Sequence, residues 1–438
     1  MKPTALIPCL AALCWAHPLQ AQTDGGGARV ARPARVASAP VVDGRLDDPA
    51  WSGSTPLDGF VQREPLQGTP VSERTEVRLA VDDEALYVGA WLFDSDPSGI
   101  VYGETRRDAD PKDVDAILLV FDTYMDRQNG FLFGTTPAGI EYDGQISKEG
   151  EGNLDPNRRQ QTGSGGGFNV NWDGSWTVAP FRDDAGWYAE FRIPFGTLRY
   201  GHAGEQSWGL NVARRIRRKN EEAFWAPVAR QFNVYRVSDA GTLEGFDAPA
   251  RMAITASPYV LGSVRRDYTA PGGSEDSGTR EFGVDAKLVT ASSLTLDMTL
   301  NTDFAQVEVD DEEVNLTRFR LFFPEKRPFF LENAGTFSVG TPQETELFFS
   351  RRIGIEGGEA VPIVGGGRLT GRVAGLTLGL LDIHTNEVEG LVPSNNFSVA
   401  RVMKELPNRT RIGTALVTRL NAGDTEDRNV VYAADGSL

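Results

Sequence analysis

Short apolar or alternating runs extend along nearly the whole chain, and Gly, Asp and Pro separate them. With 48 Gly and 25 Pro in 438 residues, turns are too frequent for a helical bundle. Many short strands with frequent turn residues are typical of antiparallel β folds. We therefore predict an all-β chain, long enough for two or three domains.

The first half of the chain predicts an antiparallel β-sandwich of the immunoglobulin or jelly-roll kind, ending near residue 250. Glu76–Asp82 alternates apolar with polar residues, which indicates a half-buried strand. Leu86–Phe93 is apolar on both faces and should be a central strand. Further strands are predicted at Asp115–Asp122, Gly130–Phe133, Trp176–Phe181, Trp187–Ile193 and Trp208–Ile216.

After Arg251 the pattern changes to longer alternating segments, such as Ser292–Thr302 and Gly365–Val373. This is the pattern of a transmembrane antiparallel β-barrel, whose strands need about 9–11 residues each. A second soluble sandwich has the same alternation and stays open as an alternative. We expect only the first part of a barrel here, because the chain ends in a turn-like tail without a closing aromatic strand.

The N-terminus predicts export. A basic residue, an apolar run and a small residue near Ala21 form a secretory signal peptide over residues 1–21. A linker at 22–36, the sandwich at 37–250 and the partial barrel at 252–438 complete the predicted organisation. The only cysteines, Cys9 and Cys14, lie in the signal peptide, which excludes disulfides and cysteine zinc sites. The formal net charge of −17 argues against nucleic acid as a partner.

Two stretches of the first half resemble family 9 carbohydrate-binding modules, which are β-sandwiches first met beside xylanases. They are Val41–Trp51, read as Val-Val-Asp-Gly-Arg-Leu-Asp-Asp-Pro-Ala-Trp, and Trp187–Phe195. The resemblance implies sugar or glycan binding. In that family an aromatic platform comes from an Asp-Pro-Trp-x-x-Asp stretch, but here Lys112 occupies the Trp position and Leu118 replaces a later acid.

The rest of the chain resembles a group of secreted bacterial proteins that fuse such a module to an uncharacterised outer-membrane domain. Its marks are Asn301–Glu308, Asn315–Phe319, Phe322–Glu332 and Ser350–Gly354. The residues assigned to this signature are Asp303, Phe304, Gln306, Glu308, Glu325, Arg327, Glu332, Arg351 and Arg352. We expect Glu and Arg of the 325–332 segment to pair while the Phe rings pack inside the barrel or against its wall. The segment either gates a pore or is a purely structural element.

Other aromatic residues are candidates for the lost sugar platform, besides Lys112 itself. Trp172 and Trp176 flank a turn, and Trp225 lies beside two glutamates. The alternative for all three is packing inside the sandwich, since aromatic side chains bury large areas.

A cluster of acids suggests structural Ca²⁺, a hard cation that takes 6–8 oxygen ligands. The candidates are Asp110, Asp113, Asp115 and Asp122, and the alternative is a solvated acidic loop. The basic run Arg214–Lys219 is interpreted as surface ion pairing, because two glutamates follow it directly.

These observations predict an exported outer-membrane protein whose sandwich is periplasmic or lies at the barrel mouth. Its partners would be a polysaccharide or glycan and outer-membrane lipid, and it would assist uptake. One alternative is a glycan-degrading hydrolase, implied only through the xylanase association, since no catalytic motif is present. The other is a structural envelope protein with a degenerate binding site.

Overall fold

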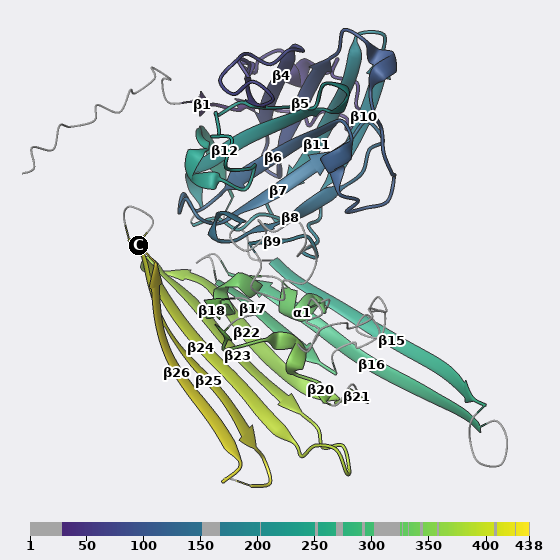
Figure 1. Ribbon diagram of the computed structural model, residues 1–438, viewed down its shortest axis with the longest axis vertical. Helices are drawn as coiled ribbons and strands as arrows, with labels where there is room; N and C mark the ends of the chain where they lie inside the picture. The colour runs from purple at the N-terminus through teal and green to yellow at the C-terminus, as the bar shows by residue number, and fades with distance from the viewer. Residues whose placement is uncertain are drawn as a thin grey trace, which may run out of the picture.

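A computed structural model describes residues 29–150, 167–201, 203–249, 253–268, 275–290, 294–301, 325, 327–331, 333–341, 345–356, 359–406, 410–424 and 426–437. The chain forms a β-sandwich above a separate curved sheet (Figure 1). Within the described residues the one α-helix is α1, Pro328–Leu331. The predicted all-β class is therefore confirmed. Within the same part of the chain, no helix is long and apolar enough to cross a membrane.

The sandwich consists of two sheets. The larger has the strand order β1 (Val30–Ala31), β14 (Gly241–Ala248), β12 (Gly204–Ile216), β6 (Ala116–Asp122), β7 (Gly130–Thr135), β8 (Tyr142–Ile146) and β9 (Phe168–Asn169). Beside β12 lie β13 (Glu221–Phe224) and then β3 (Val61–Glu64). The smaller has the order β10 (Thr177–Asp183), β11 (Gly186–Pro194), β5 (Ala85–Phe93), β4 (Thr75–Val81) and β2 (Ala34–Arg35). The strand pairs are antiparallel except β1 with β14 and β2 with β4, which are parallel.

The start of the sandwich corrects one prediction. Residues 30–35, assigned to the linker from composition, form β1 and β2 and extend both sheets. Composition missed them because a two-residue strand is too short to show periodicity. The signal peptide falls outside the described residues.

The main core lies between the two sheets and is rich in aromatic residues. Phe121, Trp187 and Trp208 are completely buried there. Strand β6 is buried along its whole length, because a second apolar cluster that includes Val228 and Val237 covers its other face. Strand β5 lies between β4 and β11, as its apolar sequence predicted, and its outer face packs against Trp51.

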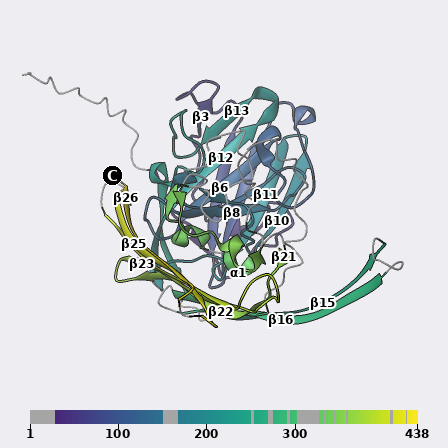
Figure 2. The same cartoon turned by 60° about the horizontal axis from the view of Figure 1, so that its bottom comes forward.

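The second body is an eight-stranded sheet in which sequence neighbours pair antiparallel. Its strands in order are β15 (Ala253–Asp267), β16 (Glu275–Val289), β17 (Leu294–Leu300), β22 (Ile363–Val373), β23 (Leu376–Thr385), β24 (Asn395–Glu405), β25 (Arg411–Asn421) and β26 (Arg428–Ser437). Shorter elements lie between β17 and β22: α1, η7 (Ala334–Phe337), β18 (Gly340–Thr341), β19 (Thr345–Glu346), η8 (Ser350–Arg352), β20 (Ile355–Glu356) and β21 (Glu359–Ala360). Figure 2 shows the sheet curved around the α1 segment.

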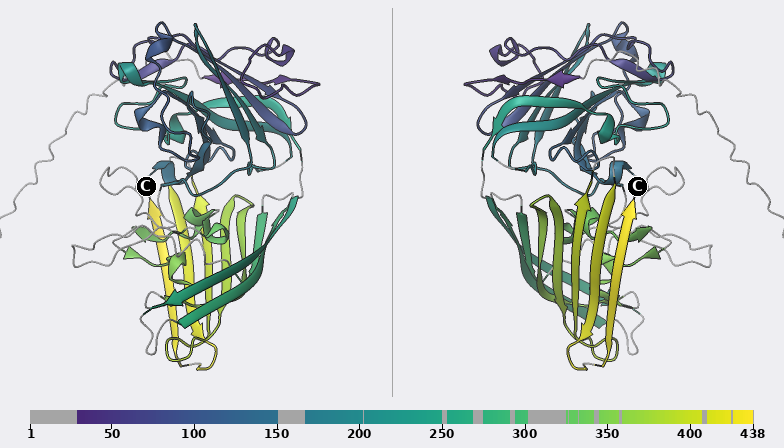
Figure 3. Two further views of the ribbon diagram at one scale, coloured as in Figure 1. Left: turned by 90° about the vertical axis from the view of Figure 1, so that its right-hand side faces the viewer. Right: turned by 90° about the vertical axis from the view of Figure 1, so that its left-hand side faces the viewer.

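This sheet is open. Strands β15 and β26 are its two edges, and in the described residues they do not pair with each other. Closure into a barrel therefore stays a prediction. The sandwich lies above the sheet at the end where β15 begins and β26 ends (Figure 3).

Alternation along the strands gives this sheet two different faces. In β17, Thr295, Asp297 and Thr299 are buried, whereas Met298 and Leu300 are exposed. In β24, Arg401 is completely buried and Val402 is exposed. Polar and charged residues thus face the concave side, together with the apolar residues that contact α1, and large apolar residues face outward.

Candidate functional site

The three tryptophans predicted to stack on sugar lie inside the sandwich. Trp172 packs on Phe131 with ring centroids 5.1 Å apart, and Trp176 stacks on Phe191 at 5.8 Å. Both are about 95% buried, and Trp225 is 2% exposed. The three tryptophans therefore pack inside the sandwich and do not form a sugar platform, because buried rings have no open face for a ligand.

The acids proposed as calcium ligands do not converge. Asp110 caps the short 3₁₀ helix Pro111–Asp113 by accepting the Lys112 N–H at 3.1 Å. Asp113 is exposed and faces Arg217 at 3.6 Å. Asp115 and Asp122 lie at opposite ends of β6, roughly 20 Å apart at about 3.3 Å per residue.

Among the residues that the structure describes, no three His, Cys, Asp or Glu side chains come together to hold a metal ion. The four acids therefore do not fit a shared Ca²⁺. Lys112 is likewise a surface residue, with its Nζ 3.5 Å from Asp110.

The two stretches that resemble carbohydrate-binding modules meet at the Glu190 carboxylate. The backbone N–H groups of Asp43 and Gly44 donate to it at 3.1 and 3.2 Å, and the Trp51 indole donates at 3.1 Å. Gly44 is required in this turn, since its φ is +82° and a Cβ would lie 2.6 Å from the Pro180 carbonyl carbon. Burial raises the pKa of Glu190 to about 7 despite these donors. These hydrogen bonds attach the N-terminal segment to β11.

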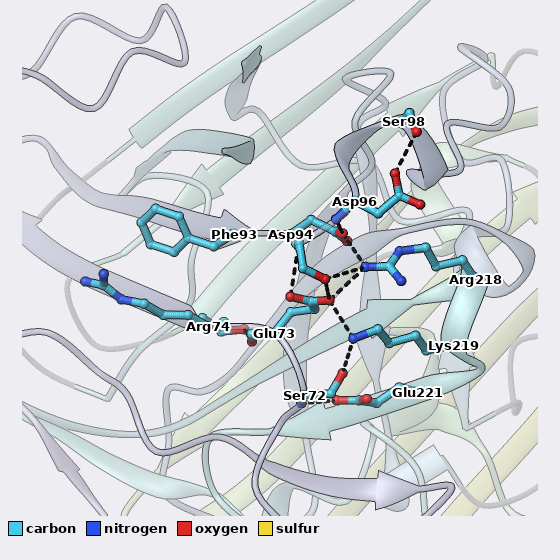
Figure 4. Close-up of polar contacts among 12 residues, drawn as sticks. Ser72, Glu73, Arg74, Phe93, Asp94, Asp96, Ser98, Arg218, Lys219 and Glu221 are labelled. Atoms are coloured by element: carbon cyan, nitrogen blue, oxygen red, sulfur yellow. Dashed lines mark hydrogen bonds and ion pairs between the residues drawn. The ribbon is translucent and has the colours of Figure 1, made fainter. Parts of the chain in front are cut away.

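The basic residues at the end of β12 form polar contacts between the two sheets of the sandwich. Arg214 is completely buried and donates to the backbone carbonyls of Arg74 at 2.9 Å and Phe93 at 2.6 Å. Figure 4 shows Arg218 and Lys219 reaching the Glu73 carboxylate, with Arg218 also on Asp94. Burial opposes ionisation of Glu73, but hydrogen bonds from Lys219 and Ser95 outweigh it and lower its pKa to about 2. The predicted ion pairs are present. They are partly buried, and they connect one sheet of the sandwich to the other.

In the second body, the Phe322–Glu332 and Ser350–Gly354 motifs also meet. Arg327 forms two hydrogen bonds with Glu325, at 2.8 and 2.7 Å, and both side chains are at most 1% exposed. The Arg327 guanidinium also donates to the carbonyls of Ser350 and Ile353, and Ser350 Oγ donates to Glu325.

The phenylalanines of this segment contact the sheet wall. Phe329 and Phe330 cluster with Ile363, Ile383 and Val399 of three successive strands. The expected Glu–Arg pair and the packing of Phe against the wall are confirmed. Arg351 is buried and Arg352 exposed. Asp303, Phe304, Gln306, Glu308 and Glu332 lie outside the described residues.

Hydrogen bonds connect the sandwich with the second body. The Asn333 N–H donates to Gln145 of β8 at 3.0 Å, and its side-chain amide donates to Thr370 of β22 at 3.1 Å. Asn169 of β9 donates to the Leu331 carbonyl at 3.0 Å. Asn333 therefore bridges both bodies.

Beside these links lies a cavity of about 110 Å³, lined by both polar and apolar surface. A water molecule needs about 10–15 Å³ by this measure, so the cavity holds several waters or a small polar ligand. Its charged lining residues come from both bodies: Asp126, Lys148, Arg199, Arg372, Glu405 and Arg411. The rest of the lining consists of amides, hydroxyls, glycines, the rings of Tyr124 and Phe131, and the apolar side chains of Ile146 and Met403. This is the candidate functional site, hereafter the junction cavity.

The loop that enters the junction cavity from the sandwich is held firmly. The Asp126 carboxylate accepts the N–H groups of Gln128 and Asn129 at 2.8 and 2.7 Å. Beneath it, buried Asp122 accepts the Arg127 N–H at 2.7 Å. Burial, followed by the nearby Asp126 charge, raises the pKa of Asp122 to about 7.

Sequence reasoning missed the junction cavity. Its lining comes from stretches near residues 126, 147, 199, 335, 372, 405 and 411, which no local pattern connects. The one local signal is the Asp122–Asn129 stretch, where acids and Asn at turn spacing indicate a structured loop.

Residues 248–362 match a family model described as "Domain of unknown function (DUF5916)". The match confirms that this part of the chain resembles a domain family without an assigned function. No curated protein matches the chain.

Among solved structures, the chain is similar to a family 9 carbohydrate-binding module from Caldicellulosiruptor kristjanssonii in complex with cellotriose. The identity is 14%, the TM-score is 0.32, and the match covers 49% of this chain and 93% of that one. A glucose complex of a module from the same organism gives the same identity and TM-score, and covers 49% and 95% of the two chains.

Proposed function

We propose that this chain is an exported outer-membrane protein that binds glycans at the cell envelope and assists their uptake. Its eight-stranded sheet would form part of a transmembrane barrel wall. Its sandwich would lie on the periplasmic rim, where the junction cavity receives the ligand.

The division of the sheet into two faces carries the membrane part of this proposal. The concave face buries ion pairs such as Arg368 with Asp297, at 2.8 Å. The convex face exposes large apolar side chains along its strands, among them Phe282, Leu300, Leu380, Ile412 and Tyr432. Outward apolar residues alternating with inward polar ones are typical of a membrane-facing wall.

The connections between strands support a periplasmic sandwich. At the sandwich end the connections are short, spanning 290–293, 374–375 and 406–410. At the opposite end they span 268–274, 386–394, 422–427 and the long stretch 301–362. Transmembrane barrels have short periplasmic turns and longer extracellular loops.

The lining of the junction cavity supports a glycan as the ligand. Small-ligand sites combine apolar surface with a few placed polar groups. Here Tyr124 provides ring surface, while the amides of Asn129, Gln145 and Asn333 can exchange hydrogen bonds with hydroxyl groups.

A structural envelope protein is the second candidate, favoured by the burial of Trp172, Trp176 and Trp225. Titration separates the two. The full chain, purified from membranes in detergent, should bind xylan, cellulose or related oligomers and lose that binding in a Tyr124→Ala variant that remains folded.

Fractionation tests the membrane part. We expect the chain with the outer membrane, resistant to salt washing and released by detergent. Recovery as a monodisperse protein in buffer without detergent would reject the barrel wall, and absence of binding to any glycan would leave the structural role.

A further inference from the structure

We infer that the convex face of the eight-stranded sheet binds a glycolipid, with an acyl chain in a groove on this face and the sugar head group beside Asp382. This inference rests on the proposed position of the sheet in the outer membrane. It assigns a lipid site that is separate from the junction cavity.

The convex side of the sheet, turned away from α1 in Figure 2, contains a groove of about 490 Å³. The side chains of its lining face outward by strand alternation, since Leu380 is 46% exposed whereas the next residue, Leu381, is buried. Ala400 is paired between Leu380 and Leu416 and is smaller than both, which leaves room for an alkyl chain. Strand pairing places five apolar lining residues in one row across the sheet: Leu296, Leu369, Leu380, Ala400 and Leu416.

The next row of the groove is polar. Its members also line the groove and are paired in turn across β22, β23, β24 and β25: Gly367, Asp382, Ser398 and Thr418. A Cβ on Gly367 would meet one atom within 4 Å, the Asp297 carbonyl oxygen at 3.7 Å, so the space above this residue is open. The groove therefore places an apolar strip and a polar strip side by side, as an amphiphilic ligand requires.

The polar row lies toward the end of the sheet that the proposed function places on the outside of the membrane. Strand β23 ends at Thr385, so Asp382 is three residues, roughly 10 Å at about 3.3 Å per residue, from the end of its strand. The connection that follows, 386–394, is at the end opposite the sandwich. We expect the head groups of the outer leaflet at this level, with their acyl chains extending along the apolar row.

Asp382 determines which head group fits. Its exposed carboxylate accepts hydrogen bonds from Asn396 Nδ2 at 3.0 Å and from Ser398 Oγ at 2.6 Å. Within the described residues these donors are neutral, and no Lys or Arg side chain pairs with Asp382. A carboxylate on a lipid-facing wall is costly unless polar groups surround it. It also repels the phosphate of a phospholipid, whereas the hydroxyl groups of a sugar donate hydrogen bonds to it.

The neutral groups beside Asp382 distinguish a sugar from a single ammonium group. Asn396 provides an amide, and Ser398 and Thr418 provide hydroxyls, around one carboxylate. A sugar has hydroxyl groups on most ring carbons and exchanges hydrogen bonds with several such groups at once. An ammonium group is bound chiefly through its charge, for which one exposed carboxylate provides little selectivity.

The test is native mass spectrometry of the full chain in detergent, titrated with three lipids that have the same acyl chains: a glucosyl diacylglycerol, phosphatidylethanolamine and phosphatidylglycerol. We expect the glucosyl lipid to bind at least fivefold more tightly than either phospholipid. Asp382→Ala should bring the three affinities to within twofold of each other. Ala400→Phe, which fills the apolar row, should weaken binding of all three lipids at least fivefold.

Two matched controls should leave lipid binding unchanged. Thr414→Phe makes an equally large substitution at an exposed residue of the same face, outside the groove lining. Asp424→Ala removes an exposed carboxylate from the connection 422–427.

Equal binding of the three lipids, or preference for either phospholipid, overturns the inference. Equal effects of Ala400→Phe and Thr414→Phe also overturn it, because they show general lipid contact without a site. A lipid-free dimer that dissociates in Ala400→Phe assigns the groove to a second copy of the chain. If Ala400→Phe fails to fold, Asp382→Ala still decides. These outcomes leave the proposed function intact as long as the chain fractionates with the outer membrane, whereas failure of that fractionation rejects both.

Discussion

The sandwich and the eight-stranded sheet place their apolar side chains on opposite sides. In the sandwich, Trp187, Trp208 and Phe121 are enclosed between two sheets. In the second body, Leu380 and Ile412 face outward, while Arg401 is completely buried on the concave side. Apolar surface leaves water in the first arrangement and remains exposed in the second. Alternating strands thus enclose their large apolar side chains in one body and expose them in the other.

Charged groups differ between the bodies in the same way. The sandwich joins its two sheets with partly buried ion pairs such as Glu73–Arg218, and the core between the sheets is apolar. The second body holds the Glu325–Arg327 pair within the apolar cluster that joins the signature motifs to the wall. Four predictions test this contrast.

The largest effect is expected for Arg327→Ala. It leaves the Glu325 carboxylate buried without its ion-pair partner, which typically costs about 3–5 kcal/mol. The unfolding transition of the second body should fall accordingly in detergent, while that of the sandwich stays in place. Arg352→Ala, on an exposed neighbour, should change stability by less than ~0.5 kcal/mol. Equal effects of the two variants would show that the Glu325–Arg327 pair does not stabilise the body.

Leu380→Arg tests the outward face. If this side chain contacts lipid, arginine there costs about 2–4 kcal/mol near the bilayer midplane. If it contacts water, the substitution is nearly neutral, because Leu380 is already 46% exposed. Urea unfolding in lipid vesicles measures the difference. Lys404→Arg, which keeps the charge at an exposed position close to the sandwich, is the control.

The pH dependence of the sandwich comes next. Burial raises the pKa values of Asp122 and Glu190 to about 7 and that of Asp143 to about 6. A raised folded-state pKa favours the protonated form, so this stabilisation is complete below about pH 4 and is lost as pH rises to about 7. The lowered pKa of Glu73 has the opposite effect on stability, because its stabilisation is lost as pH falls. This loss occurs only below about pH 4.5.

We therefore expect the free energy of unfolding of the sandwich to decrease steadily between pH 4.5 and 7.5, since each pKa unit corresponds to about 1.4 kcal/mol per group. Thermal unfolding followed by tryptophan fluorescence reports it. Constant or rising stability over this range would contradict burial as the dominant influence on these three groups.

The smallest effect is expected for Asn333→Ala, which removes the side-chain hydrogen bond to Thr370 within the second body and the long one, 3.4 Å, that Asn333 Oδ1 accepts from Gln145 across the two bodies. A single hydrogen bond contributes about 1 kcal/mol, so neither body should lose much stability. Hydrogen exchange at β8 and β22 should nonetheless increase together. An increase confined to one body would show that Asn333 does not couple them.

Several features of this protein followed from the sequence by itself. Alternation and turn residues located most of the larger strands, because strand period and turn chemistry are local properties. The fully apolar stretch at Leu86–Phe93 predicted a strand buried on both faces, and β5 is that strand. The Glu–Arg–Phe segment predicted a buried pair within aromatic surroundings, since charges placed between phenylalanines need partners.

The tertiary structure alone decided which residues meet. The sequence places Trp172 and Trp176 beside a turn whether their rings are exposed or buried. Only their packing against Phe131 of β7 and Phe191 of β11 shows that both rings lie in the core. Glu190 joins a motif 140 residues away, and Asn333 connects β8 with β22. The junction cavity exists because two separately predictable bodies contact each other. Local periodicity determines a strand and its faces, but contacts between distant segments depend on the free energy of the whole chain.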